Sequence, residues 1–363
     1  MRLKPFLQGF GMLAVLLTLL PIAVADFWWI RMFDFPHIQL TILTFVAIVI
    51  YFIKFDIKWL QDYIFVTVLI ACFIFQLVKI YPYLPHSNFE VGDSSSKSDK
   101  SDNILFYSAN VFQDNMNSSL LIREIAINDP DVLLLMETNK RWRNDISGAI
   151  SKYPYKIEVP LDNTYGMLLY SKLKMKDAKV RYLVNDSIPS IHTILVLKNG
   201  KEVSFHAIHP TPPMPQENPT STDRDAEMMQ LAVMSMDREL PVIVAGDFND
   251  VAWSGTSVLF KNVSRLLDVR VGRGFYNSFD VSSFILKWPL DHFFVSEEFR
   301  VSEIKTGESI DSDHYPFYIS LSLEPDKATE QKAKYPSENQ LKRAVDQIEQ
   351  AKKARKEKGM AVE

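Results

Sequence analysis

The sequence has only one cysteine, Cys72, among its 363 residues. A single thiol excludes an intramolecular disulfide framework and any zinc site built from several thiolates. The sequence also lacks an excess of positive charge, because 40 Lys and Arg stand against 44 Asp and Glu. This balance excludes a broadly cationic protein that coats nucleic acid. Hydrophobic residues are plentiful at 47%, so the chain can bury enough apolar surface to offset the conformational entropy of folding.

Charge is distributed unevenly along the chain. Residues 1–102 carry 8 Lys and Arg against 8 Asp and Glu, and residues 103–325 carry 22 against 29. Residues 326–363 carry 10 against 7. The length exceeds that of one average domain. We therefore expect an apolar N-terminal region, an acidic globular middle region and a basic C-terminal tail.

Three long apolar runs lie in the first 80 residues, at Phe6–Ala25, Phe35–Ile53 and Tyr63–Ile80. Each has about 18–20 residues, enough to cross the hydrocarbon of a bilayer as a helix. Charged residues and tryptophans mark the ends of the runs, as is typical of membrane interfaces. We predict a transmembrane region over residues 1–86, and the alternative is three buried helices of a soluble core.

The first run also has the pattern of a signal peptide, since basic residues precede it and residues 23–25 (AVA) form a cleavage-like site. Whether or not it is cleaved, we expect the same topology for the rest of the chain. The basic N-terminus and the loop with Lys54 and Lys58 outweigh Arg31 in the opposite loop, and basic loops stay in the cytoplasm. The sequence thus predicts an integral membrane protein of the cell or inner membrane, whose residues after Ile80 are extracytoplasmic.

Polar segments flank the middle region on both sides. Residues 87–102 (SNFEVGDSSSKSDKSD) are serine-rich and without periodicity, which predicts a flexible linker. In the tail, residues 336–358 have apolar side chains at helical spacing, so a charged amphipathic helix is expected. That helix is either solvated or in contact with anionic lipid headgroups.

Residues 103–325 alternate between short β-rich runs and helical patterns. Strands are expected at Asn103–Ala109, Val132–Met136, Gly166–Tyr170, Thr193–Leu197, Val203–Ile208, Val242–Ala245 and His292–Val295. Ser118–Asn128 and Asp223–Met236 have helical spacing. The periodicity alone indicates an α/β domain with about ten strands in two sheets.

Polar side chains follow these apolar runs at five places. The residues are Asn110, Glu137, His209, Asp247, Asn249, Asp291, Asp313 and His314. The carboxylates are hard oxygen ligands suited to Mg²⁺ or Mn²⁺. The histidines can transfer protons or bind phosphate, and the asparagines can hydrogen-bond phosphate without adding negative charge. Together these groups are those that phosphodiester hydrolysis requires.

Each residue also has a local explanation. Glu137 could be the partner of a helix N-cap, and Asp247 could begin an Asx turn. Asp313 could cap a turn, and His209 could be an ordinary loop histidine. Because all the clusters follow apolar strands of one region, a shared site is the more economical interpretation.

An ordered set of motifs resembles the endonuclease/exonuclease/phosphatase superfamily, which includes deoxyribonuclease I and neutral sphingomyelinases. The motifs are SAN at 108–110, DPDVLLLME at 129–137, YGMLLYS at 165–171, AIHP at 207–210, VAGDFN at 244–249, LDHFFVS at 290–296 and SDHYP at 312–316. The resemblance covers about residues 103–323 and implies a four-layer α/β sandwich of two packed sheets with outer helices.

The resemblance also implies a role for each residue. Glu137 matches the metal-binding glutamate, with Asn110 beside it and Asp313 as the second acidic residue near the metal. Asp247 and Asn249 match the pair that activates the attacking water. His314 matches the histidine that contacts the phosphate, and Asp291 matches the carboxylate that orients this histidine. His209 matches the acid that protonates the leaving group. Asn110 and Asn249 are also expected to contact the phosphate.

The chain departs from the family pattern at two places. Apurinic endonucleases have tyrosine at the position of His209, so that branch fits less well. They also have an aspartate where this chain has Phe112, which puts a second metal ion in doubt. A segment with five prolines, Pro210–Pro219, is expected to be a stiff loop near the site, and Trp253 either lines the site or packs elsewhere.

The sequence thus predicts a membrane-anchored, Mg²⁺-dependent phosphoesterase, with Mn²⁺ as the other candidate cofactor. Nucleic acid, a phospholipid headgroup or a small phosphodiester could be the substrate. The acidic middle region does not favour long nucleic acid, and no protein partner can be inferred. The alternative is a catalytically inactive membrane protein that uses the fold for binding.

Overall fold

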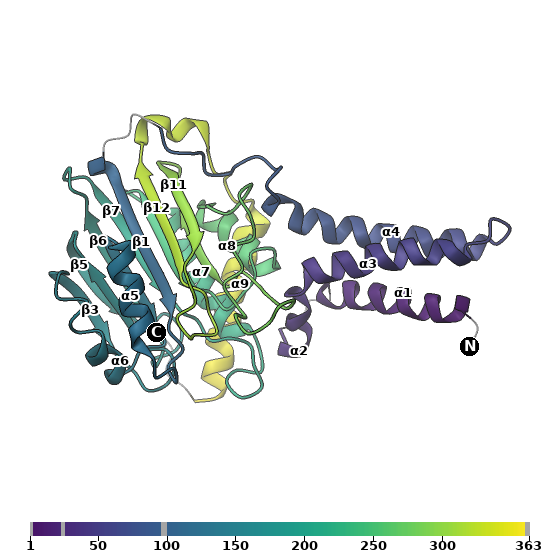
Figure 1. Ribbon diagram of the computed structural model, residues 1–363, viewed down its shortest axis with the longest axis horizontal. Helices are drawn as coiled ribbons and strands as arrows, with labels where there is room; N and C mark the ends of the chain where they lie inside the picture. Colours follow the sequence, from purple (N-terminus) through teal and green to yellow (C-terminus); the bar gives the residue numbers. More distant parts are fainter. Residues whose placement is uncertain (1–2, 23–25, 96–99, 360–363) are drawn as a thin grey trace.

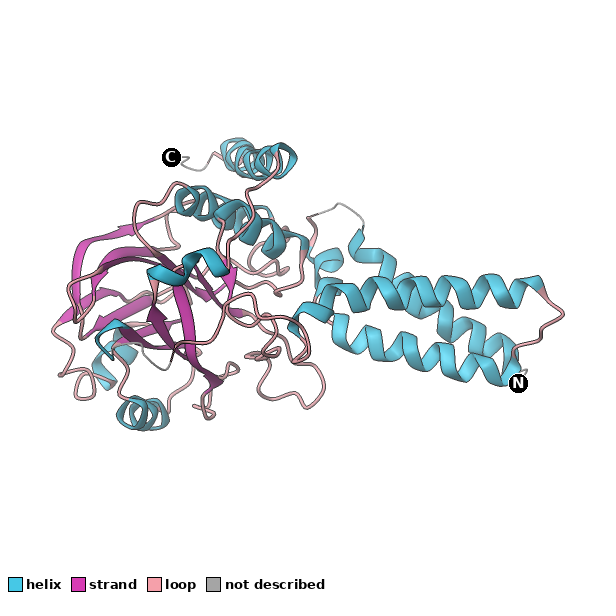
Figure 2. Ribbon diagram, turned by 90° about the horizontal axis from the view of Figure 1, so that it is seen from above, coloured by secondary structure: helices cyan, strands magenta, loops and turns pink. Residues whose placement is uncertain are grey.

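The computed structural model describes residues 3–22, 26–95 and 100–359. It has two parts: an α/β domain and a bundle of long helices that projects from one side of that domain (Figures 1 and 2). The apolar N-terminal region forms the bundle, and the acidic middle region and the C-terminal tail form the domain.

Two six-stranded sheets form the domain. The first has the order β11 (Phe299–Thr306), β12 (Phe317–Leu323), β1 (Asn103–Asn110), β2 (Val132–Met136), β4 (Met167–Ser171), β3 (Tyr155–Val159). The second has the order β5 (Lys174–Arg181), β6 (Ser190–Val196), β7 (Glu202–Ile208), β8 (Val242–Asp247), β10 (Asp291–Val295), β9 (Leu267–Asp268). The pairs β1–β2 and β7–β8 are parallel and the other pairs are antiparallel. Each sheet thus has a parallel pair near its centre whose carboxyl ends share one edge.

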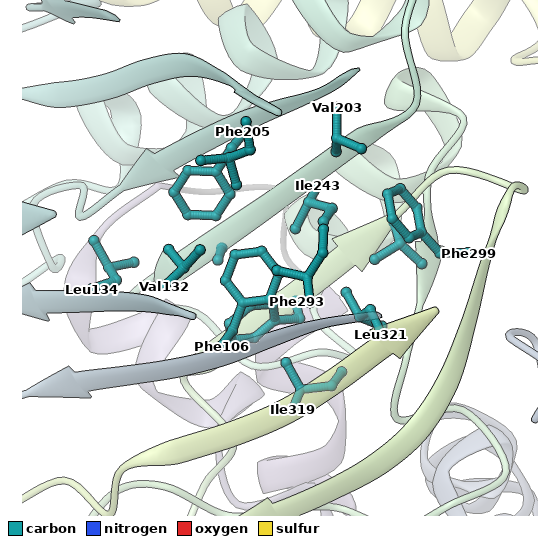
Figure 3. Packing of buried hydrophobic residues seen from close by; sticks show 14 of the residues in the cluster. Phe106, Val132, Leu134, Val203, Phe205, Ile243, Phe293, Phe299, Ile319 and Leu321 are labelled. Carbon is teal, nitrogen blue, oxygen red and sulfur yellow. The ribbon is translucent and has the colours of Figure 1, made fainter. Parts of the chain in front are cut away.

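The space between the sheets is filled by apolar side chains from both inner faces (Figure 3). Phe106 of β1 is stacked on Phe205 of β7, with ring centroids 5.4 Å apart, and meets Phe293 of β10 edge-on at 5.7 Å. All three rings are fully buried. Burying one such side chain stabilises the fold by about 2–3 kcal/mol. This packing therefore fixes the position of one sheet, and of its edges, relative to the other.

Helices cover the outer faces of both sheets. On the first sheet, α5 (Ser118–Asn128) and α6 (Lys140–Asp145) pack through Leu121, Ile125 and Trp142. On the second sheet lie α7 (Thr222–Met236), α8 (Gly255–Ser264) and α9 (Glu338–Glu357). Helix, sheet, sheet and helix make four layers, which confirms the predicted four-layer α/β sandwich.

All seven strands expected from the sequence are present, but the described residues contain twelve strands rather than about ten. The strands that the pattern missed are β3, β5, β9, β11 and β12. Strand β5 shows the reason, because it lies at a sheet edge and none of its eight residues is buried. Without a buried face, an edge strand has no apolar alternation to detect.

Three helices of the bundle are long and apolar enough to cross a membrane. They are α1 (Leu3–Leu19), α3 (His37–Tyr51) and α4 (Leu60–Ile80), and 3₁₀ turns extend them to Ile22, Lys54 and Tyr83. Only 28–33% of the residues in their apolar windows are buried. Helices of a soluble core would be buried, so the alternative of three core helices is wrong. The cleavage-like residues 23–25 lie outside the described residues.

The segment predicted as a flexible linker is ordered against the domain over residues 87–95. Val91 is fully buried in the core between the sheets. The Val301 N–H donates to Gly92 O at 3.0 Å, and the Ser94 N–H donates to Val301 O at 2.9 Å. This part of the prediction is wrong because backbone pairing holds a polar segment that has no periodicity of its own. Residues 96–99 lie outside the described residues.

The predicted helix of the tail is α9, and it packs on the domain. Ala344 and Ala351 are buried, and α9 lies against α7. Arg355 of α9 forms an ion pair with Asp223 of α7, with 3.5 Å between Nη1 and Oδ2. The apolar side of the helix therefore faces the protein, which neither alternative for the tail included. Lipid contact by its outward side stays a prediction.

Candidate active site

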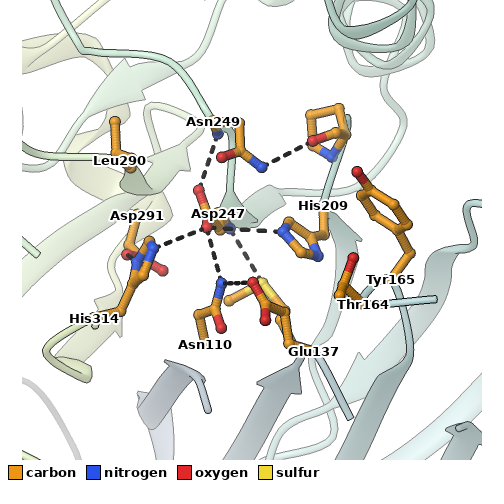
Figure 4. A network of polar contacts seen from close by, with 12 residues as sticks. Asn110, Glu137, Thr164, Tyr165, His209, Asp247, Asn249, Leu290, Asp291 and His314 are labelled. Atoms are coloured by element: carbon orange, nitrogen blue, oxygen red, sulfur yellow. Dashed lines mark hydrogen bonds and ion pairs between the residues drawn. The ribbon is translucent and has the colours of Figure 1, made fainter. Parts of the chain in front are cut away.

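The eight candidate residues lie at one edge of the sandwich. Asn110 ends β1, Glu137 follows β2, His209 follows β7 and Asp247 ends β8. Asp291 begins β10, which is antiparallel to β8, so its first residue reaches the same edge. Asn249 follows β8, and Asp313 and His314 precede β12. Figure 4 shows seven of these side chains turned toward one another, from both sheets.

Asp247 is the centre of this group (Figure 4). Its Oδ2 lies 3.2 Å from Asn110 Nδ2, 3.5 Å from His314 Nε2 and 3.8 Å from His209 Nε2. Its Oδ1 accepts the backbone N–H of Asn249 at 2.9 Å. The Asx-turn contact is therefore real, but it uses one oxygen only. The other oxygen is directed between two imidazoles.

The backbone at the strand ends is forced into unusual conformations. A Cβ on Gly246, where φ is +145°, would lie 1.9 Å from Ile208 O, so only glycine fits between β7 and β8. Glu137, Asn249 and Phe112 have φ of 58°, 50° and 55°, in the left-handed region that non-glycine residues avoid. Such strain is concentrated at functional sites, and here it turns the strand-end side chains inward.

His314 is held between two carboxylates. Its Nδ1 lies 2.8 Å from Asp291 Oδ2, and its Nε2 faces Asp247. Burial lowers the pKa of His314, but the charges of Asp247 and Asp291 outweigh that effect and raise it to about 10. The ring of Phe279 covers it, with 5.0 Å between ring centroids. His314 is therefore an imidazolium at neutral pH and supplies positive charge beside Asp247.

His209, unlike His314, is a neutral imidazole at neutral pH. Burial lowers the pKa of His209, although the charge of Asp247 opposes the shift. Its Nδ1 has no hydrogen-bond partner among the described residues. The ring of Tyr165 lies against it at 5.3 Å, and the Tyr165 hydroxyl donates to Glu217. Sequence reasoning missed Tyr165 as a site residue, although it stands in the YGMLLYS motif.

Glu137 is a partly buried carboxylate, and the nearby imidazolium of His314 offsets its desolvation only in part. Its oxygens accept from Asn110 Nδ2 at 2.8 Å and from the Gln113 N–H at 3.2 Å, and it has no salt bridge within the described part of the chain. Burial raises the pKa of Glu137 to about 7, and the charge of Asp313 adds to the shift. Glu137 does not cap a helix, because Asn139 caps α6.

These observations fit a divalent cation. Two partly buried carboxylates, Glu137 and Asp313, keep raised pKa values although the charge of His314 lowers both. Asn110 donates from Nδ2 to Glu137, and its Oδ1, which accepts the Phe112 N–H at 3.0 Å, has a second lone pair that could bind a cation. Mg²⁺ binds such oxygen sets and would neutralise both carboxylates.

A second set of candidate ligands is formed by Asp247, Asp291 and His314, whose ligand atoms lie within 4.8 Å of one another. An imidazolium has no free lone pair, so His314 in its protonated state cannot bind a metal ion. The short contact to Asp291 also already uses its Nδ1. The geometry therefore favours an ion-paired triad here and a cation nearer to Glu137.

Charged residues behind the site hold Asn249 in place. Arg224 of α7 donates to Asn249 O at 2.8 Å and forms ion pairs with Asp225 and Asp250, at 2.8 and 3.3 Å. Arg224 is 2% exposed. Sequence reasoning missed it because a charged residue in a helical pattern is typical of a solvated face. Trp253, whose role the sequence left open, is buried and donates to Asp34 O at 2.7 Å, so it packs toward the bundle.

The sandwich and the strand-end site define a phosphoester-hydrolase fold. The chain belongs to the Endonuclease/Exonuclease/phosphatase family, whose model matches residues 107–314. Members of this family are nucleases and phosphatases that act on phosphoester bonds. The predicted resemblance is thus confirmed, while no curated protein matches the chain in sequence.

Solved structures share the fold at low sequence identity. D. rerio TDP2, complexed with single strand DNA product, matches with a TM-score of 0.50 and 14% identity over 61% of this chain and 99% of that chain. A mannosyl-6-phosphatase from Bacteroides thetaiotaomicron matches with a TM-score of 0.47 and 18% identity over 61% of this chain and 100% of that chain. Both likenesses concern the fold alone.

Proposed function

We propose that this protein is a membrane-anchored, Mg²⁺-dependent phosphodiesterase that works outside the cytoplasm. The observation that carries the proposal is the position of Asp247, which is buried between a protonated and a neutral histidine. It also lies next to Glu137, whose charge His314 offsets only in part. A binding protein without catalytic activity would have no need to keep these costly buried charges together.

Each residue has a distinct task in this proposal. A cation held by Glu137, Asp313 and Asn110 would neutralise the phosphoryl oxygens. Asp247 accepts a proton from the attacking water, and Asn249 holds that water or a phosphoryl oxygen. His314, kept protonated and oriented by Asp291, donates to a phosphoryl oxygen as charge develops on it.

His209 gives a proton to the leaving oxygen. Its pKa is lowered in the substrate-free site, so the ring must gain its proton when substrate binds. A phosphate anion beside the ring favours the charged imidazolium and supplies the necessary shift. Tyr165 packs on the ring and keeps it turned toward Asp247.

Replacing His209 with glutamine tests this role. We expect kcat to fall by about 10²–10⁴-fold for a phosphodiester with an alkoxide leaving group, which needs a proton. With 4-nitrophenolate as leaving group the loss should be small, because that anion leaves without protonation. Equal losses with both substrates would contradict the acid role.

The orientation rests on the positions of the basic residues. The start of α1 and the connection between α3 and α4 lie at the end of the bundle remote from the domain, and α2 (Trp28–Arg31) lies at the near end (Figure 1). The remote end therefore has Lys4, Lys54 and Lys58, and the near end has Arg31. Lys79, in the last turn of α4, is a second basic residue of the near end, which still has fewer than the remote end within the described residues. By the positive-inside rule, the domain then lies outside.

Cysteine labelling in intact cells tests this topology. Cys72 is the only native cysteine, so a Cys72→Ser background allows a single reporter, Asp186→Cys, on the exposed surface of the domain. A membrane-impermeant maleimide should label it without lysis. Labelling only after lysis would place the domain in the cytoplasm and contradict the proposal.

The reaction itself is tested with the full chain reconstituted in phosphatidylcholine vesicles. Hydrolysis of bis(4-nitrophenyl) phosphate should require Mg²⁺ or Mn²⁺ and stop when EDTA is added. An absence of hydrolysis with either cation would favour the alternative, a membrane protein that uses the fold for binding.

A further inference from the structure

A loop beside the site carries an exposed apolar tip. The tip consists of Phe284, Ile285 and Leu286, which are 97%, 69% and 49% exposed. Three consecutive large apolar side chains in water are unfavourable, and a soluble domain rarely presents them. We therefore expect the tip to contact a surface that does not belong to this chain.

The position of the loop indicates what that surface is. Gln39, the third residue of α3, donates from Nε2 to Ile285 O at 2.7 Å. Phe35, just before α3, meets Trp288 edge-on with ring centroids 5.7 Å apart. Residues 37–54 are a candidate membrane span, so the tip lies alongside the first turn of that span, at the depth of the bilayer interface.

The same loop forms a wall of the active site. Its two ends are joined by backbone pairing, and the Phe279 N–H donates to Trp288 O at 3.0 Å. The ring of Phe279 covers His314, and the Val281 N–H donates to Asp313 O at 2.9 Å. The apolar tip is thus connected within a few residues to the groups that meet the phosphate.

A second loop connects the opposite side of the site to the bundle. Asn249 Nδ2 donates to Pro210 O at 3.0 Å, at the start of the proline-rich segment. At its far end, the N–H of Trp28 in α2 (Trp28–Arg31) donates to Pro219 O at 2.9 Å. Trp29 of α2 is 48% exposed, as suits the interface. Both loops therefore place the site on the side that faces the membrane.

The charge of the loop also fits a lipid headgroup. Lys287 follows the apolar tip directly, and its Nζ lies 4.9 Å from the ring centroid of Tyr315, next to His314. A cation one residue from inserted apolar side chains is well placed for an anionic phosphate at the bilayer surface. Long nucleic acid is favoured by an excess of basic residues, whereas residues 103–325 carry 22 Lys and Arg against 29 Asp and Glu.

We infer that the substrate is a phosphodiester carried by a lipid, and that the tip enters the outer leaflet beside α3 and holds the site against the headgroups. This inference rests on the proposed function. The three spans already anchor the protein, so the tip is not required for membrane attachment. Its effect is to place the site at the level of the phosphates.

Two matched substrates separate lipid from soluble phosphodiesters. Both are 4-methylumbelliferyl phosphodiesters, with either methanol or a diacylglycerol as the second alcohol, and the latter is embedded in phosphatidylcholine vesicles that contain the full chain. We expect the embedded ester to have the higher kcat/KM. Replacing the tip by Phe284→Ser, Ile285→Ser and Leu286→Ser should lower the ratio of embedded to soluble kcat/KM at least about tenfold.

The matched control is Ile127→Ser, on the exposed side of α5, where Ile127 is 64% exposed. It should leave the ratio unchanged. A soluble ester that is hydrolysed at least as well as the embedded one, or a ratio that the tip variant does not change, would overturn the inference while leaving the phosphodiesterase in place.

A second measurement does not depend on activity. In the Cys72→Ser background, Phe284→Cys is labelled with an environment-sensitive fluorophore, and Ile127→Cys serves as the aqueous reference. We expect the label at 284 to report an apolar environment and to be quenched by spin-labelled lipids. If it behaves like the label at 127, the tip does not enter the bilayer and the inference fails, even in an active enzyme.

Discussion

Replacing Asp247 with asparagine is expected to lower kcat for phosphodiester hydrolysis at least about 10³-fold. Asparagine keeps the size of the side chain and one oxygen for the Asn249 N–H. It removes the proton acceptor and also the charge that keeps the pKa of His314 high. A steady-state assay with bis(4-nitrophenyl) phosphate measures the loss.

The matched control is Asp186→Asn, which changes an exposed carboxylate of the same domain. It should keep the full rate. The Asp247→Asn protein should also unfold at a temperature at least as high as the original, because removing a buried charge relieves its desolvation. Hydrolysis by Asp247→Asn at the original rate would show that the proton acceptor is another group.

The second large effect is expected from Glu137→Gln. An amide at this position should raise the Mg²⁺ concentration needed for half-maximal activity at least about 10²-fold, because a carboxylate ligand is lost. Glu239→Gln, which changes an exposed glutamate on the same domain, is the control. An unchanged Mg²⁺ requirement would place the cation elsewhere, with Asp247 and Asp291 as the next candidates.

Glu137 should also make Mg²⁺ binding depend on pH, and the direction of this dependence follows from the pKa of Glu137. Burial raises the pKa of Glu137 to about 7, so below that value a proton occupies the carboxylate and competes with the cation. Mg²⁺ binding should therefore weaken as pH falls below about 7, by up to about tenfold per pH unit. Calorimetric titration of Mg²⁺ measures this trend, and Glu137→Gln should remove it.

Residues at the ends of strands were the easiest part of the site to predict. Short apolar runs that end in Asn110, Glu137 and Asp247 indicate strands, and parallel central strands end at one edge. The positive φ of Glu137 and Asn249 could not be predicted from the sequence pattern, because glycine is the residue that typically indicates this conformation. The presence of the eight residues at one edge agrees with the prediction, while their catalytic and metal roles remain proposals.

What the sequence could not predict depends on long-range contacts. Arg224 is buried only because Asp225, Asp250 and the carbonyl of Asn249 surround it, and no local pattern contains that information. The segment around Val91 has the composition of a linker, yet pairing with β11 orders it. The apolar tip at Phe284 also has no periodicity, and only its position beside α3 gives it meaning.

The most direct test of the central claim is hydrolysis of bis(4-nitrophenyl) phosphate in ¹⁸O-labelled water by the full chain in vesicles. If Asp247 activates water for attack on phosphorus, one ¹⁸O should enter the 4-nitrophenyl phosphate product, and only when Mg²⁺ or Mn²⁺ is present. Label in the nitrophenol, or hydrolysis that continues at the same rate in EDTA, would contradict the account.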